Sequence, residues 1–359
     1  MLKARKKKSE TIAGMIRENL LGHPLPAGTP VASSREIARK YKVSLSTADQ
    51  ALNLLVQEDF LYRTKGSGTF LKLDSYARPL RIGVADQIVS SQYLSPEINR
   101  ILNMHFEIAG QNLIERGCLL ELLSYNSMRQ KNLTENMDGL LVSINYMDPE
   151  ARHFLKETGL PIVVYRHHQS EPECSCVYYD YVPGIVQALD HLKLLKNDRI
   201  FLVYEQTQTG RYFYKLWKEL LLARGIIEEY ITSYEIPVDE RELSCYRLVR
   251  VNSSKFKDSV ILTCNDEVAS NLINALTLEN YSCGKDYRLV GAGDRESYGF
   301  VMGNQGQVIA SIHVPIETMA KEAAKLLLYK ITNKVEYNCQ IKIPTSFVPR
   351  LSSGSNNLS

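Results

Sequence analysis

Residues 33–72 read SSREIARKYKVSLSTADQALNLLVQEDFLYRTKGSGTFLK, and their pattern predicts two short helices followed by a β-hairpin. Ser33 or Ser34 can cap the first helix, which we expect to end near Tyr41. Ser44 can cap the second helix, where apolar side chains recur every three or four residues and therefore predict one buried face. That face comprises Val43, Thr47, Ala48, Ala51, Leu52 and Leu55.

The hairpin is predicted from two strand-like segments, 60–64 and 69–73, joined by the link Lys65-Gly66-Ser67-Gly68. Ahead of it, the second helix turns a mostly polar set of side chains outward. Because such a helix, when it follows a tight turn, has the geometry that enters a DNA major groove, these residues predict a DNA-reading domain. The outward side chains are Leu45, Ser46, Asp49, Gln50 and Asn53.

Four motifs follow one another here: Pro26-Ala27-Gly28, Ser-Arg-Glu-Ile at 34–37, Val-Ser-x-x-Thr at 43–47 and Gly-x-Gly-Thr-Phe at 66–70. Through them, residues 12–72 resemble the winged helix-turn-helix of GntR-type bacterial regulators. The resemblance implies that double-stranded operator DNA is the partner, read in part by an arginine at the position of Arg35. Leu45 and Asp49 stand where that family usually carries two further basic residues.

Candidate DNA contacts follow from the chemistry of base edges. Leu45 can meet a thymine methyl group, Asp49 can accept from a cytosine amino group, and Gln50 can pair with an adenine edge. The alternative is an ordinary small helical domain, in which serine caps and periodic leucines would look the same. The candidate DNA-contacting residues are Arg35, Ser44, Leu45, Ser46, Thr47, Asp49, Gln50, Arg63, Lys65 and Gly66.

Charge is distributed unevenly along the 359 residues. Residues 1–72 hold 13 Lys and Arg against 6 Asp and Glu, a formal charge of +7, whereas the whole chain carries +3 and the remainder therefore −4. The basic end is the end expected to meet nucleic acid. With 44% hydrophobic and 23% charged residues, the composition is that of a globular protein of two or three domains.

The sequence shows no membrane or secretion signal, since no apolar run approaches the ~18 residues of a membrane span and no apolar segment follows the N-terminal charges. We therefore expect a cytoplasmic protein. Seven cysteines lack Cys-x-x-Cys spacing, so neither a disulfide framework nor a zinc site is predicted. His167 and His168 are neighbours on a strand and point to opposite faces, which argues against a shared metal ion.

From Leu80 onward, apolar runs alternate with segments of helical periodicity, which predicts an α/β fold with parallel sheets and crossover helices. The expected strands span 81–85, 118–125, 139–145, 161–165, 200–204, 260–264, 288–291, 308–313 and 340–344. The expected helices span 9–21, 95–116, 184–195, 212–224, 267–280 and 315–332, and Asp148-Pro149 caps another.

Four further motifs are Met137 to Val142 (MDGLLV), Val260 to Ala269 (VILTCNDEVA), Leu289 to Asp294 (LVGAGD) and Ile343 to Leu351 (IPTSFVPRL). Through them, residues 80–351 resemble the sugar-binding domain of the LacI/GalR family, a periplasmic-binding-protein fold of two lobes with the ligand between them. The implied organisation is a winged helix-turn-helix at 1–72, a linker at 73–79, and an effector-binding and dimerisation domain at 80–351. The implied lobes are 80–179 plus 312–330, and 180–311 plus 331–350.

Candidate effector-binding residues follow predicted strand ends, because open α/β sheets bind ligands at the carboxyl ends of their strands. Asn265 and Asp294 match positions that contact sugar in the LacI/GalR family. Asp266 is instead expected to cap the following helix. Arg211, in the loop after strand 200–204, is equally a candidate for a surface arginine. Further candidates after strand ends are Asp180, Gln87 and Tyr93.

Together these features predict a ligand-responsive bacterial transcription regulator that binds operator DNA as a homodimer and responds to a sugar or sugar derivative. The helices from Ser95 and Glu267 are the expected pairing surface. The rival is a sugar-active enzyme or binding protein whose head only tethers it to DNA. The sequence contains no Gly-x-Ser-x-Gly elbow, phosphate-binding loop or His-Glu-x-x-His helix, so catalysis and a cofactor are not predicted.

Overall fold

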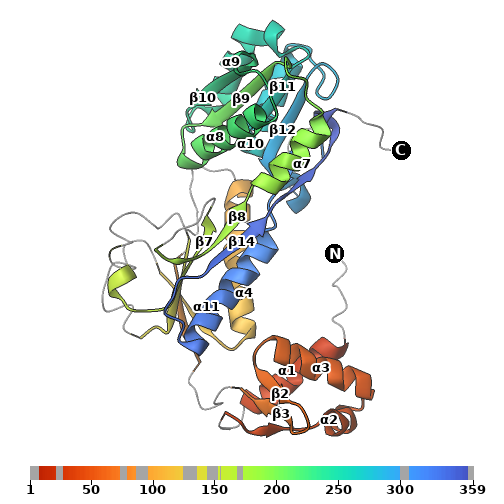
Figure 1. The fold of residues 1–359 in the computed structure, drawn as a ribbon, viewed down its shortest axis with the longest axis vertical. Coiled ribbons are helices and arrows are strands. Elements are labelled where there is room, and N and C mark those ends of the chain that lie inside the picture. Colours follow the sequence, from red (N-terminus) through yellow and green to blue (C-terminus); the bar gives the residue numbers. More distant parts are fainter. Residues whose placement is uncertain are drawn as a thin grey trace. The chain divides into compact units, whose positions relative to one another are not determined.

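The computed structural model describes residues 8–21, 27–72, 79–85, 96–123, 136–143, 153, 155–167, 173–299 and 307–354. The chain divides into two compact units, Met1–Leu80 and Arg81–Ser359 (Figure 1). The first unit contains the predicted helix pair and hairpin, and the second contains parallel sheets with crossover helices. The predicted α/β fold class with an N-terminal winged helix-turn-helix is therefore confirmed.

The first unit combines three helices with a small antiparallel sheet of order β1-β3-β2. The helix pair and the hairpin lie within two residues of their predicted bounds. A strand that the sequence did not predict, Pro30–Val31, pairs with Thr69 and Phe70 of the hairpin. The elements are α1 (Lys8–Leu21), β1 (Pro30–Val31), α2 (Ser34–Tyr41), α3 (Leu45–Gln57), β2 (Leu61–Thr64) and β3 (Gly68–Leu71).

Side-chain caps fix where α2 and α3 begin. The Glu36 carboxylate accepts from the Ser33 backbone N at 2.7 Å while Ser33 Oγ accepts from the Glu36 backbone N, which makes a capping box. Ser44 Oγ accepts from the Thr47 backbone N at 3.1 Å. Lys42 ends α2 in the left-handed conformation with φ 51°. The tight connection between the two helices is therefore built as the serine pattern predicted.

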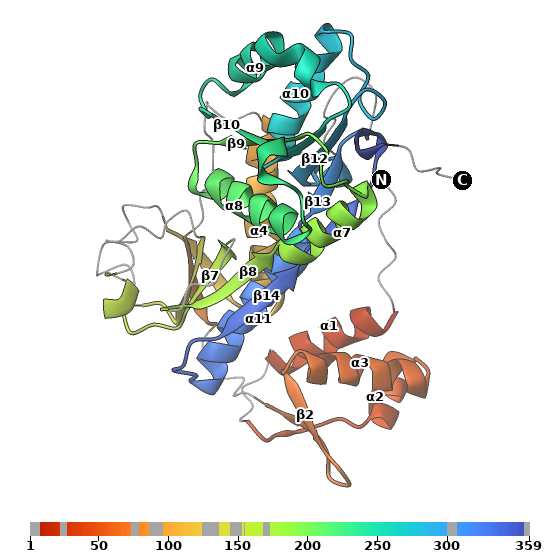
Figure 2. The ribbon, with the colours of Figure 1, turned by 45° about the horizontal axis from the view of Figure 1, so that its top comes forward.

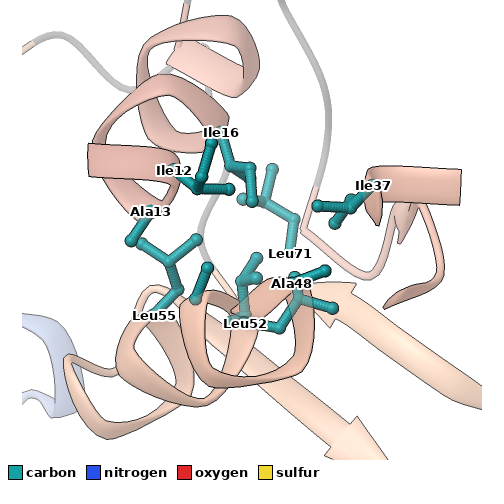
Figure 3. Packing of buried hydrophobic residues seen from close by; sticks show 10 residues of the cluster. Ile12, Ala13, Ile16, Ile37, Ala48, Leu52, Leu55 and Leu71 are labelled. Carbon is teal, nitrogen blue, oxygen red and sulfur yellow. The ribbon is translucent and has the colours of Figure 1, made fainter. Parts of the chain in front are cut away.

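The core of the first unit lies where its three helices meet the hairpin (Figure 3). Leu52 and Leu55 of α3 are completely buried, and side chains of α1, α2 and β3 close over them. The periodic stripe predicted on α3 is thus confirmed in its centre, whereas Val43 and Thr47 at its start are only half-buried. The other buried members are Ile12, Ala13, Ile16, Ile37, Ala48, Ala51, Leu61 and Leu71.

The second unit contains two mainly parallel sheets. The first has the order β14-β8-β7-β6-β4-β5, and the second has the order β10-β9-β11-β12-β13-β15, in which β15 runs antiparallel to β13. The strands are β4 (Arg81–Ala85), β5 (Leu119–Leu122), β6 (Gly139–Ser143), β7 (Ile162–His167), β8 (Ser175–Asp180), β9 (Ile200–Glu205), β10 (Ile231–Ile236), β11 (Val260–Thr263), β12 (Arg288–Gly293), β13 (Ala310–His313), β14 (Gln340–Pro344) and β15 (Ser346–Val348). The helices are α4 (Pro96–Glu115), α7 (Val182–Leu192), α8 (Gln208–Ala223), α9 (Arg241–Phe256), α10 (Asp266–Leu278) and α11 (Ile316–Asn333).

Each sheet defines a lobe, and the chain passes between the lobes after β8, after β13 and after β14. Helix α11 returns to the first lobe, where it packs against α4 (Figures 1 and 2). The predicted boundary at 331–350 is wrong in part. Residues 340–344 pair in parallel with β8 and belong to the first lobe, and β15 is the strand that joins the second sheet. In this placement the backbone N–H and C=O groups at the outer edge of β8 are paired with those of β14.

Four helices and strands described in the second unit lacked a clear signal in the sequence: β8, β10, α9 and β15. Strand β10 is the edge of its sheet, so its sequence ITSYEI stays polar and buries fully only Ile236. Helix α9 leaves Leu243 and Val251 exposed and therefore lacks a clean apolar stripe. Strand β15 is three residues long. The helix expected after Asp148-Pro149 begins outside the described residues.

Replacing Leu52 by alanine should destabilise the first unit by about 2–5 kcal/mol, because the fully buried side chain leaves a cavity. Leu45→Ala on the same helix is the control, since Leu45 is 52% exposed and its loss should cost about 0.5 kcal/mol or less. Urea unfolding of the full chain can be followed by far-UV circular dichroism and by fluorescence of Trp217, the single tryptophan, which reports on the second unit. Leu52→Ala should shift only the dichroism. Equal stability of the two variants would contradict the packing described.

Candidate DNA-binding surface and effector site

The exposed start of α3 lines a concavity of about 700 Å³ on the first unit. Its residues come from the α2 cap region and from the first turns of α3. Arg35, Leu45 and Ser46 are exposed there, as a surface for base contacts requires. Predicted DNA-contacting residues of both helices thus lie at one concavity. The lining consists of Ser33, Ser34, Arg35, Leu45, Ser46 and Asp49.

The other predicted DNA contacts divide by exposure. Gln50, Lys65 and Gly66 are exposed, whereas Thr47 is half-buried and the Ser44 hydroxyl caps α3. Gly66 has φ +81° at the tip of the hairpin, a conformation that explains why glycine stands there. Whether these residues touch DNA stays a prediction.

Asp49 differs from its neighbours because its carboxylate is already engaged. Arg63 Nη2 donates to Oδ1 at 2.8 Å, Ser34 Oγ donates to the same oxygen at 3.0 Å, and Asn53 Nδ2 donates to Oδ2 at 3.2 Å. The hydrogen bond from Arg63 is the main reason why the pKa of Asp49 lies below its usual value. An Asp49 contact with a cytosine amino group would compete with these donors.

The candidate effector site of the second lobe lies at the carboxyl ends of β9, β11, β12 and β13, where an open α/β sheet binds ligands. Asn265, after β11, caps α10 by accepting from the Val268 backbone N at 2.8 Å. Its Nδ2 donates to Glu205 Oε2, at the end of β9, at 2.9 Å. Arg241, the first residue of α9, pairs with the same Glu205 carboxylate. Strand ends far apart in sequence thus form one polar cluster.

Asp294, after β12, is fully buried and contacts two basic side chains. His313 Nδ1 lies 2.7 Å from Oδ2, and Arg350 Nη2 donates to Oδ1 at 2.6 Å. Burial alone would raise the pKa of this carboxyl, but hydrogen bonds from His313, Ser297 and Arg350 bring it below its ordinary value. In this arrangement Asp294 orients His313, whose ring is partly exposed and stacks on Tyr298.

Asp266 does not cap α10 as expected, because Asn265 takes that position. Its fully buried carboxylate instead accepts from Ser311 Oγ at 2.7 Å and from the Arg295 backbone N at 2.8 Å. A Cβ at Gly291 would lie 2.2 Å from Asp266 Oδ1, so glycine makes room for the carboxylate. The strand predicted to end at Gly291 continues to Gly293. Asp266 therefore ties three strand ends together.

The remaining effector candidates are placed less favourably. Arg211 lies in the first turn of α8 rather than in a loop, and its exposed side chain pairs with Glu235 at 2.8 Å. The earlier start of α8 follows from Thr207, whose hydroxyl caps it by accepting from the Gly210 backbone N. Asp180 ends β8 and pairs with Lys342 at 2.8 Å. Gln87 and Tyr93 lie outside the described residues.

Sequence reasoning missed four residues of this site: Glu205, Arg241, His313 and Arg350. A charged residue that closes an apolar run, as in FLVYE and ASIH, was the available signal for Glu205 and His313. Arg241 and Arg350 gave no local signal, because their partners are remote in sequence. No group of three or more His, Cys, Asp or Glu that could hold a metal ion occurs among the described residues.

Comparison with known proteins assigns both units. Residues 8–71 match the model of bacterial regulatory proteins of the gntR family, and residues 189–353 match that of a periplasmic binding protein-like domain. The chain is 26% identical over 326 residues, 85% of each chain, to an arabinose metabolism transcriptional repressor of Geobacillus stearothermophilus. A repressor of the same name from Halalkalibacterium halodurans is 25% identical over 339 residues, 86% of this chain and 85% of that one.

Solved structures share the fold. The transcriptional regulator CelR in its cellobiose complex aligns with a TM-score of 0.59 at 18% identity, over 97% of this chain and 100% of that one. A LacI family regulator from Enterococcus faecium with bound ribose gives 0.59 at 19% identity, over 77% and 100%. The lac repressor dimer bound to operator gives 0.60 at 16% identity, over 77% and 95%.

The protein is thus a DNA-binding transcription regulator of two domains. Its first domain is of the GntR family, and its second is a periplasmic binding protein-like domain with the LacI-type fold. Its relatives are regulators and not enzymes, which removes the sugar-active enzyme as an alternative. Across the described residues, no helix is long and apolar enough to cross a membrane.

The second domain should lose stability as the pH rises towards 7 because of Asp266. Burial raises the pKa of this carboxyl to about 7. The folded protein therefore binds its proton more tightly than the unfolded chain, and the stabilisation is complete below about pH 4 and lost as the pH passes the folded pKa. Asp266→Asn should flatten the dependence between these values, measured by Trp217 fluorescence in urea. If the stability of Asp266→Asn changed with pH as steeply as that of the wild type, Asp266 would not be the group responsible.

Proposed function

We propose that the protein is a repressor that binds operator DNA through its first domain and releases or tightens that contact when a sugar binds the second. The observation that carries this proposal is the polar cluster at the strand ends of the second lobe, joined in one chain to a GntR-family domain. The names of the relatives support repression. A chromosomal target implies that the protein acts in the cytoplasm.

The charged pairs at the strand ends of the second lobe favour an uncharged sugar over a sugar phosphate. A phosphate needs cations that are free to pair with it, whereas the cations described at these strand ends already face carboxylates. Hydroxyl groups, in contrast, can exchange hydrogen bonds with such fixed pairs. Because the relatives are named for arabinose metabolism, arabinose is the first candidate. The pairs are Arg241 with Glu205, Arg295 with Glu267, and Arg350 and His313 with Asp294.

The proposed response is a shift between two arrangements of the lobes. The chain passes between the lobes three times, so a ligand held by both can favour a closed arrangement. A ligand changes operator affinity only to the extent that it binds the two arrangements unequally. The measurable quantity is therefore the ratio of operator affinities with and without sugar.

We further propose a homodimer that pairs through α4, β5 and α10. Strand β5 is the open edge of the first sheet and exposes Leu119 and Leu122 by 56% and 52%. Ile114 of α4 is 55% exposed, and Leu278 of α10 is 70% exposed. An apolar edge strand promotes unwanted association unless a partner covers it, which supports pairing at this face. The helices expected from Ser95 and Glu267 correspond to α4 and α10.

A thermal-shift screen should identify the effector. Arabinose at 100 times its Kd should stabilise the second domain by about 2.7 kcal/mol, and arabinose 5-phosphate should have no comparable effect. His313→Gln and Asn265→Ala should abolish the shift, because both remove groups of the polar cluster. Lys321→Ala, on the exposed face of α11, is the control and should keep it. A wild-type shift with the phosphate but not the free sugar would overturn the proposed ligand class.

Charge introduced on the β5 edge should separate the dimer. Leu119→Glu combined with Leu122→Glu places one carboxylate on each side of the β5 edge, so sedimentation should show a monomer and titration should show weaker operator binding. The matched control is Val251→Glu on α9, an 81% exposed side chain of the second lobe, whereas β5 belongs to the sheet of the first lobe. A wild-type monomer, or an undisturbed dimer in the double variant, would reject pairing through β5.

A further inference from the structure

Helix α3 presents an exposed face to the concavity but carries no lysine or arginine anywhere in its sequence LSTADQALNLLVQ. Recognition of bases in the major groove commonly uses arginine, whose planar fork matches O6 and N7 of guanine. Arg35 of α2 lines the same concavity, and a second cation reaches α3 from the hairpin. It is Arg63 of β2.

The strand geometry directs Arg63 towards α3. Side chains two residues apart lie on the same face of a strand, and Leu61 of β2 is buried in the core against α3. Arg63 therefore projects towards the same helix, beyond the edge of the core. Its side chain remains 34% exposed despite the contact with Asp49.

Asp49 fixes the position of that guanidinium. Its Oδ1 accepts from Arg63 Nη2 at 2.8 Å and from Ser34 Oγ of α2 at 3.0 Å, while Oδ2 accepts from Asn53 Nδ2 at 3.2 Å. Donors from α2, α3 and β2 thus hold one carboxylate. A carboxylate held in this way is poorly placed to accept from a base, but it restricts the rotamers of the arginine that it binds.

We propose that Arg63, positioned by Asp49, is a base-reading arginine of this protein, beside Arg35, and recognises a guanine of the operator. The guanidinium has five N–H donors, and the contact with Asp49 leaves donors for a bidentate contact with O6 and N7. Asp49 is a positioning residue in this account. The proposal rests on operator binding by the first domain, as proposed above, and adds the residue and the base.

Two other roles of Arg63 make different predictions. If the ion pair only ties the hairpin to α3, removing it would lower the stability of the first domain without changing base preference. If Arg63 instead contacts a DNA phosphate, replacing it would weaken binding to all sequences alike and reduce the salt dependence of binding. Base reading alone changes the preference at one position of each half-site.

The experiment begins with selection of a consensus from a random duplex library by the full-length protein. Binding of the consensus, and of duplexes with each G·C pair replaced by A·T, is then measured for wild type, Arg63→Lys and Asp49→Asn. One replacement should weaken wild-type binding about 10- to 100-fold, the range for a good base contact. Arg63→Lys keeps the charge but loses the planar fork, so this preference should fall clearly below that of the wild type. Asp49→Asn should reduce it at the same base pair.

Asp59→Asn is the matched control, because Asp59 also accepts from a cation that follows the hairpin, Lys72, at 2.8 Å but does not line the concavity. It should leave every base preference intact. Uniform weakening across all duplexes, or unchanged discrimination in Arg63→Lys and Asp49→Asn, would overturn the assignment while leaving operator binding in place. Failure of the wild type to enrich any sequence would instead refute operator recognition, and the assignment with it.

Discussion

The contact between Asp180 and Thr345 holds together two of the three passages of the chain between the lobes. The Asp180 carbonyl oxygen accepts from the Thr345 backbone N at 3.0 Å and from its Oγ1 at 2.8 Å. Gly184 makes this approach possible, since a Cβ there would lie 2.7 Å from Thr345 Oγ1. Two adjacent segments are therefore bound side by side at the passage between the lobes.

The strand ends of the second lobe are organised by buried carboxylates. Asp266 and Asp294 are linked through Ser311, which donates to the first and accepts from the backbone N of the second at 3.0 Å. Arg350, near the end of the described chain, closes the arrangement on Asp294. The same device occurs in the first domain, where Asp49 holds Arg63. In both domains a fixed carboxylate orients a basic side chain.

The sequence predicted those parts of the structure that local patterns specify. Serine caps and apolar periodicity located α2 and α3, and apolar runs located the buried strands. The edge strand β10 was not predicted, because it faces solvent and keeps a polar sequence. The geometry of the candidate sites could not be predicted for a different reason. The carboxylates of Asp49 and Asp294 are bound by arginines 14 and 56 residues away in the sequence, and no local pattern reveals such partners. A single sequence therefore located the carboxyl ends of the predicted strands to within three residues but could not show which carboxylates already had partners.

The central claim is that one chain couples ligand binding at these strand ends to operator affinity. Its most direct test is titration of a selected operator duplex with the full-length protein, with and without saturating sugar that stabilises the second domain. The account predicts an operator affinity that changes at least about fivefold, the lower range of allosteric coupling, while the sugar is recovered chemically unchanged. Identical operator affinities at full sugar occupancy, or consumption of the sugar, would contradict it.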